Sequence, residues 1–243
     1  MFQSPSVRPR RPSEEERPFW ISYADLMTAM MVLFLATMAI TIVAVSKKMV
    51  GDAEAGREKQ KICEEIKRGV KNNPFVNVGC SDFRITFGEV GRFEPNKYYL
   101  VPGTEAATNA ALAELVPVIL RTARTTRGQR YLKKVVVEGY ASPVGSYLRN
   151  LHLSMQRSEW VMCLLIDPAK NEHMQLSEED SLMVQKIFLA GGVSFNEAKG
   201  DADDESSRRV EMRLEFYGIE DNLPRVIEVD RGGTKERCNV GIP

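Results

Sequence analysis

The chain has 243 residues, enough for one or two folded domains once any membrane segment is set aside. Its 33 basic and 33 acidic residues balance, so net charge gives no argument for nucleic acid as a partner. No phosphate-binding glycine loop or nucleophile–base set is present, and the two histidines and four cysteines lack metal-ligand spacing. We therefore expect neither an enzyme nor a protein that holds a metal or an organic cofactor.

An apolar run from residue 20 to residue 45 follows a polar N-terminal segment, residues 1–17. About 20 helical residues already cross a bilayer core of about 30 Å. The run is longer than the apolar part of a signal peptide, and no cleavage site of small residues follows it. The pattern therefore predicts a retained transmembrane helix over residues 18–46. Basic residues flank it almost equally on both sides, so they leave its orientation open.

Asp25 is the only charged residue of this apolar run. On a helical wheel, small and β-branched residues lie within about 60° of Asp25, and bulky apolar residues lie on the other side. Small residues let helices approach closely in membranes, so we expect Asp25 to face other helices rather than lipid. The stripe around Asp25 consists of Thr28, Ala29, Val32, Ala36, Ala39 and Val43, and the opposite side of Met27, Met30, Met31, Phe34 and Met38.

A charge inside a membrane is costly and usually marks an ion path. A carboxylate in such surroundings can take up and release a proton, and moving one charge through the membrane potential is worth about 2.3 kcal/mol per 100 mV. We therefore predict that Asp25 binds and releases the coupling ion, a proton, and that a partner with polar helices completes the path. Because Asp25 lies about two turns inside the helix boundary, an interfacial carboxylate without a transport role is the alternative.

Residues 47–74 are charged and carry apolar residues at helical spacing, which predicts a helical linker that Asn-Asn-Pro ends at 72–74. Beyond it, residues 75–217 alternate strand and helix patterns, which indicates one α+β domain with helices on one face of a mixed sheet. A C-terminal extension, residues 218–243, has no predicted element. Strands are expected at 83–87, 135–137 and 207–216, and helices at 105–123, 148–166 and 175–191.

The four cysteines can form disulfides if they lie in an oxidising cellular compartment. If the chain beyond residue 46 lies in an oxidising compartment, Cys63 and Cys80 are the favoured disulfide pair, because that bond would tie the linker helix to the start of the domain. Cys163 lies in an apolar stretch, residues 160–166, and is predicted to be a buried, small apolar residue.

The membrane segment resembles a known signature. Trp20 is followed by Tyr-Ala-Asp at residues 23–25 and by Met-Thr-Ala-Met-Met at residues 27–31. This pattern is similar to that of the flagellar stator B subunits, in which the aspartate is the proton-binding residue. Asp25 occupies that position.

Residues 83–217 resemble the OmpA-like peptidoglycan-binding domain. In that family a strand ends in Gly-His-Thr-Asp, and a helix with the pattern Asn-x-x-Leu-Ser-x-x-Arg follows. The later segment Ser-Arg-Arg-Val-Glu at residues 207–211 is similar to the family's Asn-Arg-Arg-Val-Glu. The residues in register are Gly139, Gly145, Asn150, Leu153, Ser154 and Arg157.

The resemblance implies a site for the peptidoglycan stem peptide. The family's Asp and Arg bind its free amine and carboxylate, and a guanidinium suits a carboxylate because it donates two parallel hydrogen bonds. Arg157 matches the arginine, but Ser142 stands at the position of the aspartate, and Glu138 or a loop acid such as Asp201 are candidates to replace it. The implied peptidoglycan-binding residues are Tyr140, Ser142, Asn150, Leu153, Arg157 and Arg208.

Peptidoglycan lies outside the inner membrane, so the resemblance implies a cytoplasmic N-terminus and a periplasmic domain. It also implies a homodimer inside a ring of a multi-span, stator A-like subunit, expected in five copies, which protons drive to rotate. The short spacer and Ser142 favour the B subunits of the Zorya anti-phage defence system, whose A subunit forms the ring. A flagellar or gliding stator is the alternative.

Two further classes share part of the pattern. The ExbD and TolR energisers of outer-membrane transport have a single helix with an intramembrane aspartate, but they lack the Asn-x-x-Leu-Ser-x-x-Arg pattern. A passive wall tether would need the domain but not Asp25. Replacing Asp25 with Asn separates the tether from the motor, since a tether would keep working and a motor would stop.

Overall fold

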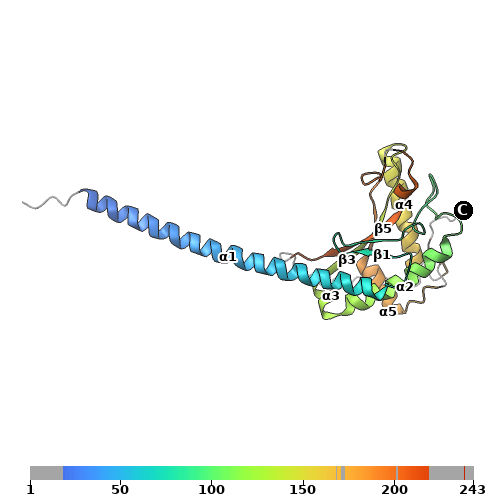
Figure 1. Ribbon diagram of the computed structural model, residues 1–243, viewed down its shortest axis with the longest axis horizontal. Helices are drawn as coiled ribbons and strands as arrows, with labels where there is room; N and C mark the ends of the chain where they lie inside the picture. The colour runs from blue at the N-terminus through green and yellow to red at the C-terminus, as the bar shows by residue number, and fades with distance from the viewer. Residues whose placement is uncertain (1–18, 168, 171–172, 201, 219–237, 239–243) are drawn as a thin grey trace, which may run out of the picture. The chain divides into compact units, whose positions relative to one another are not determined.

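The computed structural model describes residues 19–167, 169–170, 173–200, 202–218 and 238 (Figure 1). The chain divides into two compact units, Met1–Gly51 and Asp52–Pro243, which are described separately below. The predicted N-terminal segment over residues 1–17 and all but two residues of the predicted extension over 218–243 lie outside the described residues.

The described part of the first unit is helical throughout and belongs to α1 (Phe19–Gly69), as the sequence predicts. All side chains from residue 23 to residue 50 are exposed. The hydroxyl groups of Thr37 and Thr41 donate to the carbonyls of Phe34 and Met38, at 2.9 and 2.8 Å. These bonds satisfy polar groups within the helix itself, as a helix surrounded by lipid requires.

The second unit contains a mixed five-stranded sheet in the order β1-β2-β5-β3-β4. Only β3 and β4 run parallel; the other neighbours are antiparallel. This architecture confirms the predicted α+β domain. The strands are β1 (Asn77–Gly79), β2 (Arg84–Thr86), β3 (Leu132–Gly139), β4 (Phe188–Gly192) and β5 (Val210–Phe216), and the helices besides α1 are α2 (Glu105–Arg124), α3 (Thr126–Tyr131), α4 (Tyr147–Ile166), α5 (Glu178–Ile187) and the 3-10 turn η1 (Glu205–Ser207).

The two faces of the sheet differ because side chains alternate along a strand. Val135, Val137 and Met212 point into the core and are fully buried, together with apolar residues of the helices. The opposite face carries charged side chains, among them Glu138 and Arg213, which pair at 2.8 Å. The helices therefore cover one face, as predicted, and the other face is closed by ion pairs.

The predicted helix over residues 175–191 is shorter than expected, because a strand replaces its end. Ser177 starts α5 with a capping box to Asp180, and the helix ends at Ile187. The next five residues form β4, which pairs in parallel with β3. Gly192 fits there because a Cβ at this position would lie 2.7 Å from Ser154 Oγ of α4. The sequence patterns also missed β1 and α3.

The predicted linker over residues 47–74 is helical up to Gly69, but most of it belongs to the folded domain. Ile62, Ile66 and Val70 are buried in the core, where apolar burial stabilises the domain. Glu58 also pairs with Arg127 at 2.7 Å. The compact unit therefore begins at Asp52 rather than at residue 75, because the apolar stripe packs on the domain instead of standing free.

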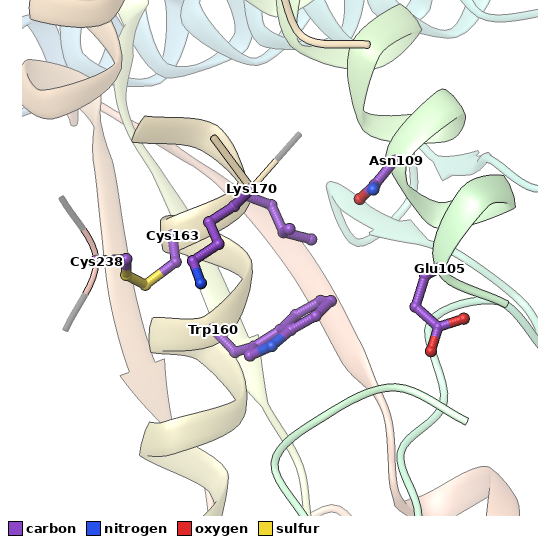
Figure 2. A pocket seen from close by; sticks show the side chains of 7 residues that line it. Glu105, Asn109, Trp160, Cys163, Lys170 and Cys238 are labelled. Carbon is purple, nitrogen blue, oxygen red and sulfur yellow. A yellow bond between two sulfur atoms is a disulfide. The ribbon is translucent and has the colours of Figure 1, made fainter. Parts of the chain in front are cut away.

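Two disulfides join segments of the second unit. Cys63 is bonded to Cys80, the pair that the sequence favours, with a Cα–Cα distance of 5.7 Å. Cys163 is buried, as predicted, and it is bonded to Cys238 at a Cα–Cα distance of 5.6 Å, a pairing that the sequence did not predict. Figure 2 shows that bond and the Trp160 ring, which lies between Cys163 and the α2 residues Glu105 and Asn109. These residues line a cavity of about 110 Å³.

Candidate functional site

Asp25, the predicted proton-binding residue, lies on the exposed part of α1. No hydrogen bond or ion pair joins its carboxylate to any described residue. The neighbouring polar group on the same stripe, the Thr28 hydroxyl, donates to the carbonyl of Ala24. A carboxylate in a membrane needs partners or water, so this site is incomplete within one chain.

The second candidate site lies where β3 ends and the chain leads into α4. Gly139 closes the strand directly against α4, since a Cβ there would lie 2.0 Å from the carbonyl oxygen of Ser154. Gly145 has φ of +105°, a conformation that side chains rarely adopt. Ser146 then caps α4 by accepting from the amide of Arg149. The structure therefore requires glycine at both positions of the motif, Gly139 for the close approach of α4 and Gly145 for its backbone conformation.

Arg157 lies under this turn and is fully buried. Its guanidinium donates to the carbonyls of Lys97, Tyr140 and Glu94, at 2.9, 2.6 and 3.1 Å. Its charge centre also lies 5.2 Å from the centre of the Phe93 ring. Burial, and then the nearby charge of Arg208, lower the pKa of Arg157 to about 9. Arg157 thus holds together the strand end and the loop over residues 93–97.

Arg208 forms the outer part of the same cluster. Its Nε donates to the Phe93 carbonyl at 3.1 Å, and its Nη1 pairs with Asp203 Oδ1 at 2.6 Å. The Asp203 carboxylate also accepts a hydrogen bond from the Ser142 hydroxyl, and this bond, with the Arg208 pair, holds the pKa of Asp203 below its ordinary value. The side chain of Arg208 is 9% exposed and that of Asp203 is 43% exposed, so Asp203 is the member that solvent reaches.

Asn150 and Leu153 stand on the same helix with different surroundings. Asn150 is buried and donates from Nδ2 to the Val144 carbonyl at 3.0 Å, which fixes the turn before α4. Leu153 is half-buried. Both lie within two turns of Arg157, so the helix brings the three motif residues to one region.

Tyr140 contributes its carbonyl to this region, but its side chain belongs to the polar face of the sheet. Its buried hydroxyl donates to Glu138 Oε2 at 2.8 Å and accepts from Arg84. Arg209 lies over its ring, 4.0 Å from the centre. Burial and the neighbouring Glu138 raise the pKa of Tyr140 above its ordinary value. The side chain therefore serves the ion-pair network and not the site.

The structure brings five of the six predicted peptidoglycan-binding side chains to one end of the domain and turns the side chain of Tyr140 away. Of the two candidate acids, Glu138 is occupied by Arg84 and Arg213, and Asp201 lies outside the described residues. Sequence reasoning missed Asp203, which contacts both Ser142 and Arg208. Its only sequence signal is its closeness to the Arg-Arg segment. The described residues hold no group of three His, Cys, Asp or Glu side chains that could bind a metal.

Comparison with known proteins gives one match in the membrane segment and one over the whole chain. Residues 7–50 match the family described as membrane MotB of the proton-channel complex MotA/MotB. The Zorya protein ZorB of Escherichia coli O139:H28 (strain E24377A / ETEC) is 43% identical over 244 residues, which cover 98% of this chain and 97% of that protein.

Two solved structures are also similar. The OmpA-like domain of FopA1 from Francisella tularensis subsp. tularensis SCHU S4 is 16% identical and covers 59% of this chain and 82% of its own, with a TM-score of 0.34. A putative MotB like protein from Desulfovibrio vulgaris is 17% identical and covers 70% of this chain and 99% of its own, with a TM-score of 0.41. At these TM-scores neither likeness adds to the fold described above.

The membrane-segment match and the apolar N-terminal helix point to a class, the MotB-like subunits that cross the membrane once. This class consists of channel-complex subunits and is not a class of enzymes. Within it, the chain belongs to the ZorB family, as the identity over almost the whole of both chains shows.

Proposed function

We propose that this protein is the wall-anchored subunit of a proton-driven motor in the inner membrane, and that the motor serves anti-phage defence. The observation that carries the proposal is Asp25, the single carboxylate in the apolar stretch of α1, the one described helix that is long and apolar enough to cross a membrane. Membership of the ZorB family supports the defence role. In this account Asp25 accepts and releases protons, and each transfer drives a step of a surrounding ring.

The proposed partners follow from the Asp25 carboxylate, which has no hydrogen-bond or ion-pair partner among the described residues. A homodimer would place two small-residue stripes in reach of a multi-span, stator A-like subunit, and a ring of five such subunits would supply the polar groups that Asp25 lacks. The two disulfides support a periplasmic domain, because such bonds persist in oxidising compartments. The N-terminus is then cytoplasmic.

The anchor is the region around Arg157, and we propose that it binds peptidoglycan. Arg157 and Arg208 provide buried positive charge, and Ser142, Asn150 and Leu153 shape the surroundings. Tyr140 contributes its main chain. Because Arg157 is fully buried, its role here is to build the site and to set its electrostatic potential.

The test of the motor is Asp25→Asn in cells that carry the complete defence system. The matched control is Asp52→Asn, which makes the same change at an exposed position of the same helix. Asp25→Asn should reduce phage protection to that of cells without the protein, while co-purification with the multi-span partner stays unchanged. Asp52→Asn should protect as the wild type does. Protection by Asp25→Asn at the wild-type level would refute the proton-coupling role and leave a tether.

A further inference from the structure

The loop before η1 places a carboxylate beside the end of β3. Asp203 accepts from the Ser142 hydroxyl and pairs with Arg208 at 2.6 Å, so residues from two segments that are distant in the sequence hold it. Its side chain is 43% exposed, whereas Ser142 and Arg208 are buried. The carboxylate therefore has fixed partners on its inner side and solvent on its outer side.

The buried charges of the cluster do not cancel. Arg157 and Arg208 bring two buried positive charges, whereas the carboxylates that interact with Arg208, those of Asp203 and Asp204, lie in the exposed loop. The buried positive charge of the two arginines attracts an anion, and the exposed carboxylate of Asp203 attracts a cation. A ligand that carries an ammonium group and a carboxylate on neighbouring atoms complements this surface, as the free end of a diamino acid does.

Ser142 explains why the carboxylate comes from another segment. In proteins that the domain resembles, the residue at this position is itself the acid. A serine hydroxyl carries no negative charge with which to bind an ammonium ion. It can, however, donate a hydrogen bond to a carboxylate and hold it in place. Here the acceptor is Asp203, which thereby stands next to the position that the missing acid would occupy.

We propose that Asp203 is the residue that binds the ammonium group of the diamino acid in the peptidoglycan stem peptide, with Ser142 as its positioning residue. The proposal rests on the proposed wall anchoring and adds to it the charged partner of the amine. If Asp203 only neutralised Arg208, the effect of Asp203→Asn on binding would be the same whether the amine of the stem peptide is free or acetylated. An acid placed at residue 142 would then not restore binding.

The experiment measures sedimentation of the full-length protein, in detergent, with isolated sacculi whose stem peptides contain a diamino acid. Asp203→Asn is compared with the wild type and with Asp204→Asn. Asp204 is a matched control because it is the adjacent aspartate and caps η1 by accepting from the Ser206 amide, which asparagine also does. Each variant is also measured on sacculi with acetylated amines. The rescue variant combines Asp203→Asn with Ser142→Asp.

We expect Asp203→Asn to weaken binding about tenfold, the effect of one charge-assisted hydrogen bond. Asp204→Asn should bind as the wild type does. Acetylation should weaken wild-type binding to the level of Asp203→Asn and leave Asp203→Asn unchanged. Adding Ser142→Asp should restore binding to unmodified sacculi.

Three results would overturn the proposal: binding of Asp203→Asn at the wild-type level, an equal loss with Asp204→Asn, or the same loss on acetylation in wild type and Asp203→Asn. If the variant that combines Asp203→Asn with Ser142→Asp does not regain binding to sacculi, the positioning role of Ser142 is contradicted. If the wild type itself does not sediment with unmodified sacculi, the anchoring function fails, and that outcome differs from all three.

Discussion

The two candidate sites of this protein each contain an aspartate, and the two aspartates have opposite surroundings. Asp25 has no described partner on its own chain, whereas Asp203 is held by a serine hydroxyl and an arginine. A functional carboxylate without intrachain partners needs another chain to complete its site. One with partners on its inner side is already positioned and needs only a ligand. The contrast predicts that variants at the membrane end affect activity alone, and that variants at the wall end also affect stability.

The largest expected effect on stability is that of Arg157→Ala. Removal of the guanidinium leaves three carbonyls without their donor and opens a cavity, so the free energy of unfolding should fall by roughly 3–4 kcal/mol. Chemical denaturation measures this. Arg149→Ala on the same helix, at an exposed position, should stay within about 0.5 kcal/mol of the wild type. An equally small effect at Arg157 would mean that the contrast between the two ends does not hold.

A second, slightly smaller effect concerns the bond between α1 and the start of the domain. Replacing Cys63 and Cys80 with serine opens a loop with a sequence separation of 17 residues, which should cost about 3 kcal/mol. Unfolding of the variant, compared with the wild type under reducing conditions, measures it. On reduction the wild type should lose the contributions of both disulfides, and the variant only that of the bond between Cys163 and Cys238. A variant as stable as the oxidised wild type would show that α1 is attached by packing alone.

The smallest effect is the pH dependence of Asp203. Its pKa is lower in the folded chain, so the carboxylate stabilises the fold above its ordinary pKa, and this contribution is lost as the pH falls through the lowered value. The stability difference between wild type and Asp203→Asn should therefore be present at pH 7 and shrink in strong acid. Thermal unfolding at a series of pH values tests this. A difference that grows toward acid would have the wrong sign and would remove the bond from Ser142 as its cause.

Periodicity predicted the elements whose local sequence pattern is uninterrupted, and it failed where a tertiary contact determines the secondary structure. The helix of residues 105–123 and the strand of residues 207–216 have uninterrupted patterns, and both are present, although the strand begins only at Val210 because Ser207 belongs to η1. The end of the helix expected at 175–191 is a strand because β3 offers a parallel edge, which no local pattern reveals. The linker stripe of Ile62, Ile66 and Val70 has a helical period whether it packs on a dimer partner or on its own domain.

The candidate site shows the same limit. Motif spacing identified Arg157 and Asn150, because both lie on one helix at a fixed distance from a strand end. It could not place Tyr140, whose side chain turns to the polar face of the sheet, or pair Cys163 with Cys238 across 75 residues. Asp203 was missed because its relation to Ser142 exists only in the folded chain.

The most direct test of the central claim is proton flux through the assembled complex. Purified protein and its multi-span partner are reconstituted into vesicles, and proton uptake driven by a membrane potential is followed with a pH-sensitive dye. The account predicts uptake with the wild type and with Asp52→Asn, and background uptake with Asp25→Asn, although all three complexes assemble. Equal uptake by the Asp25→Asn complex would show that protons do not pass through this carboxylate.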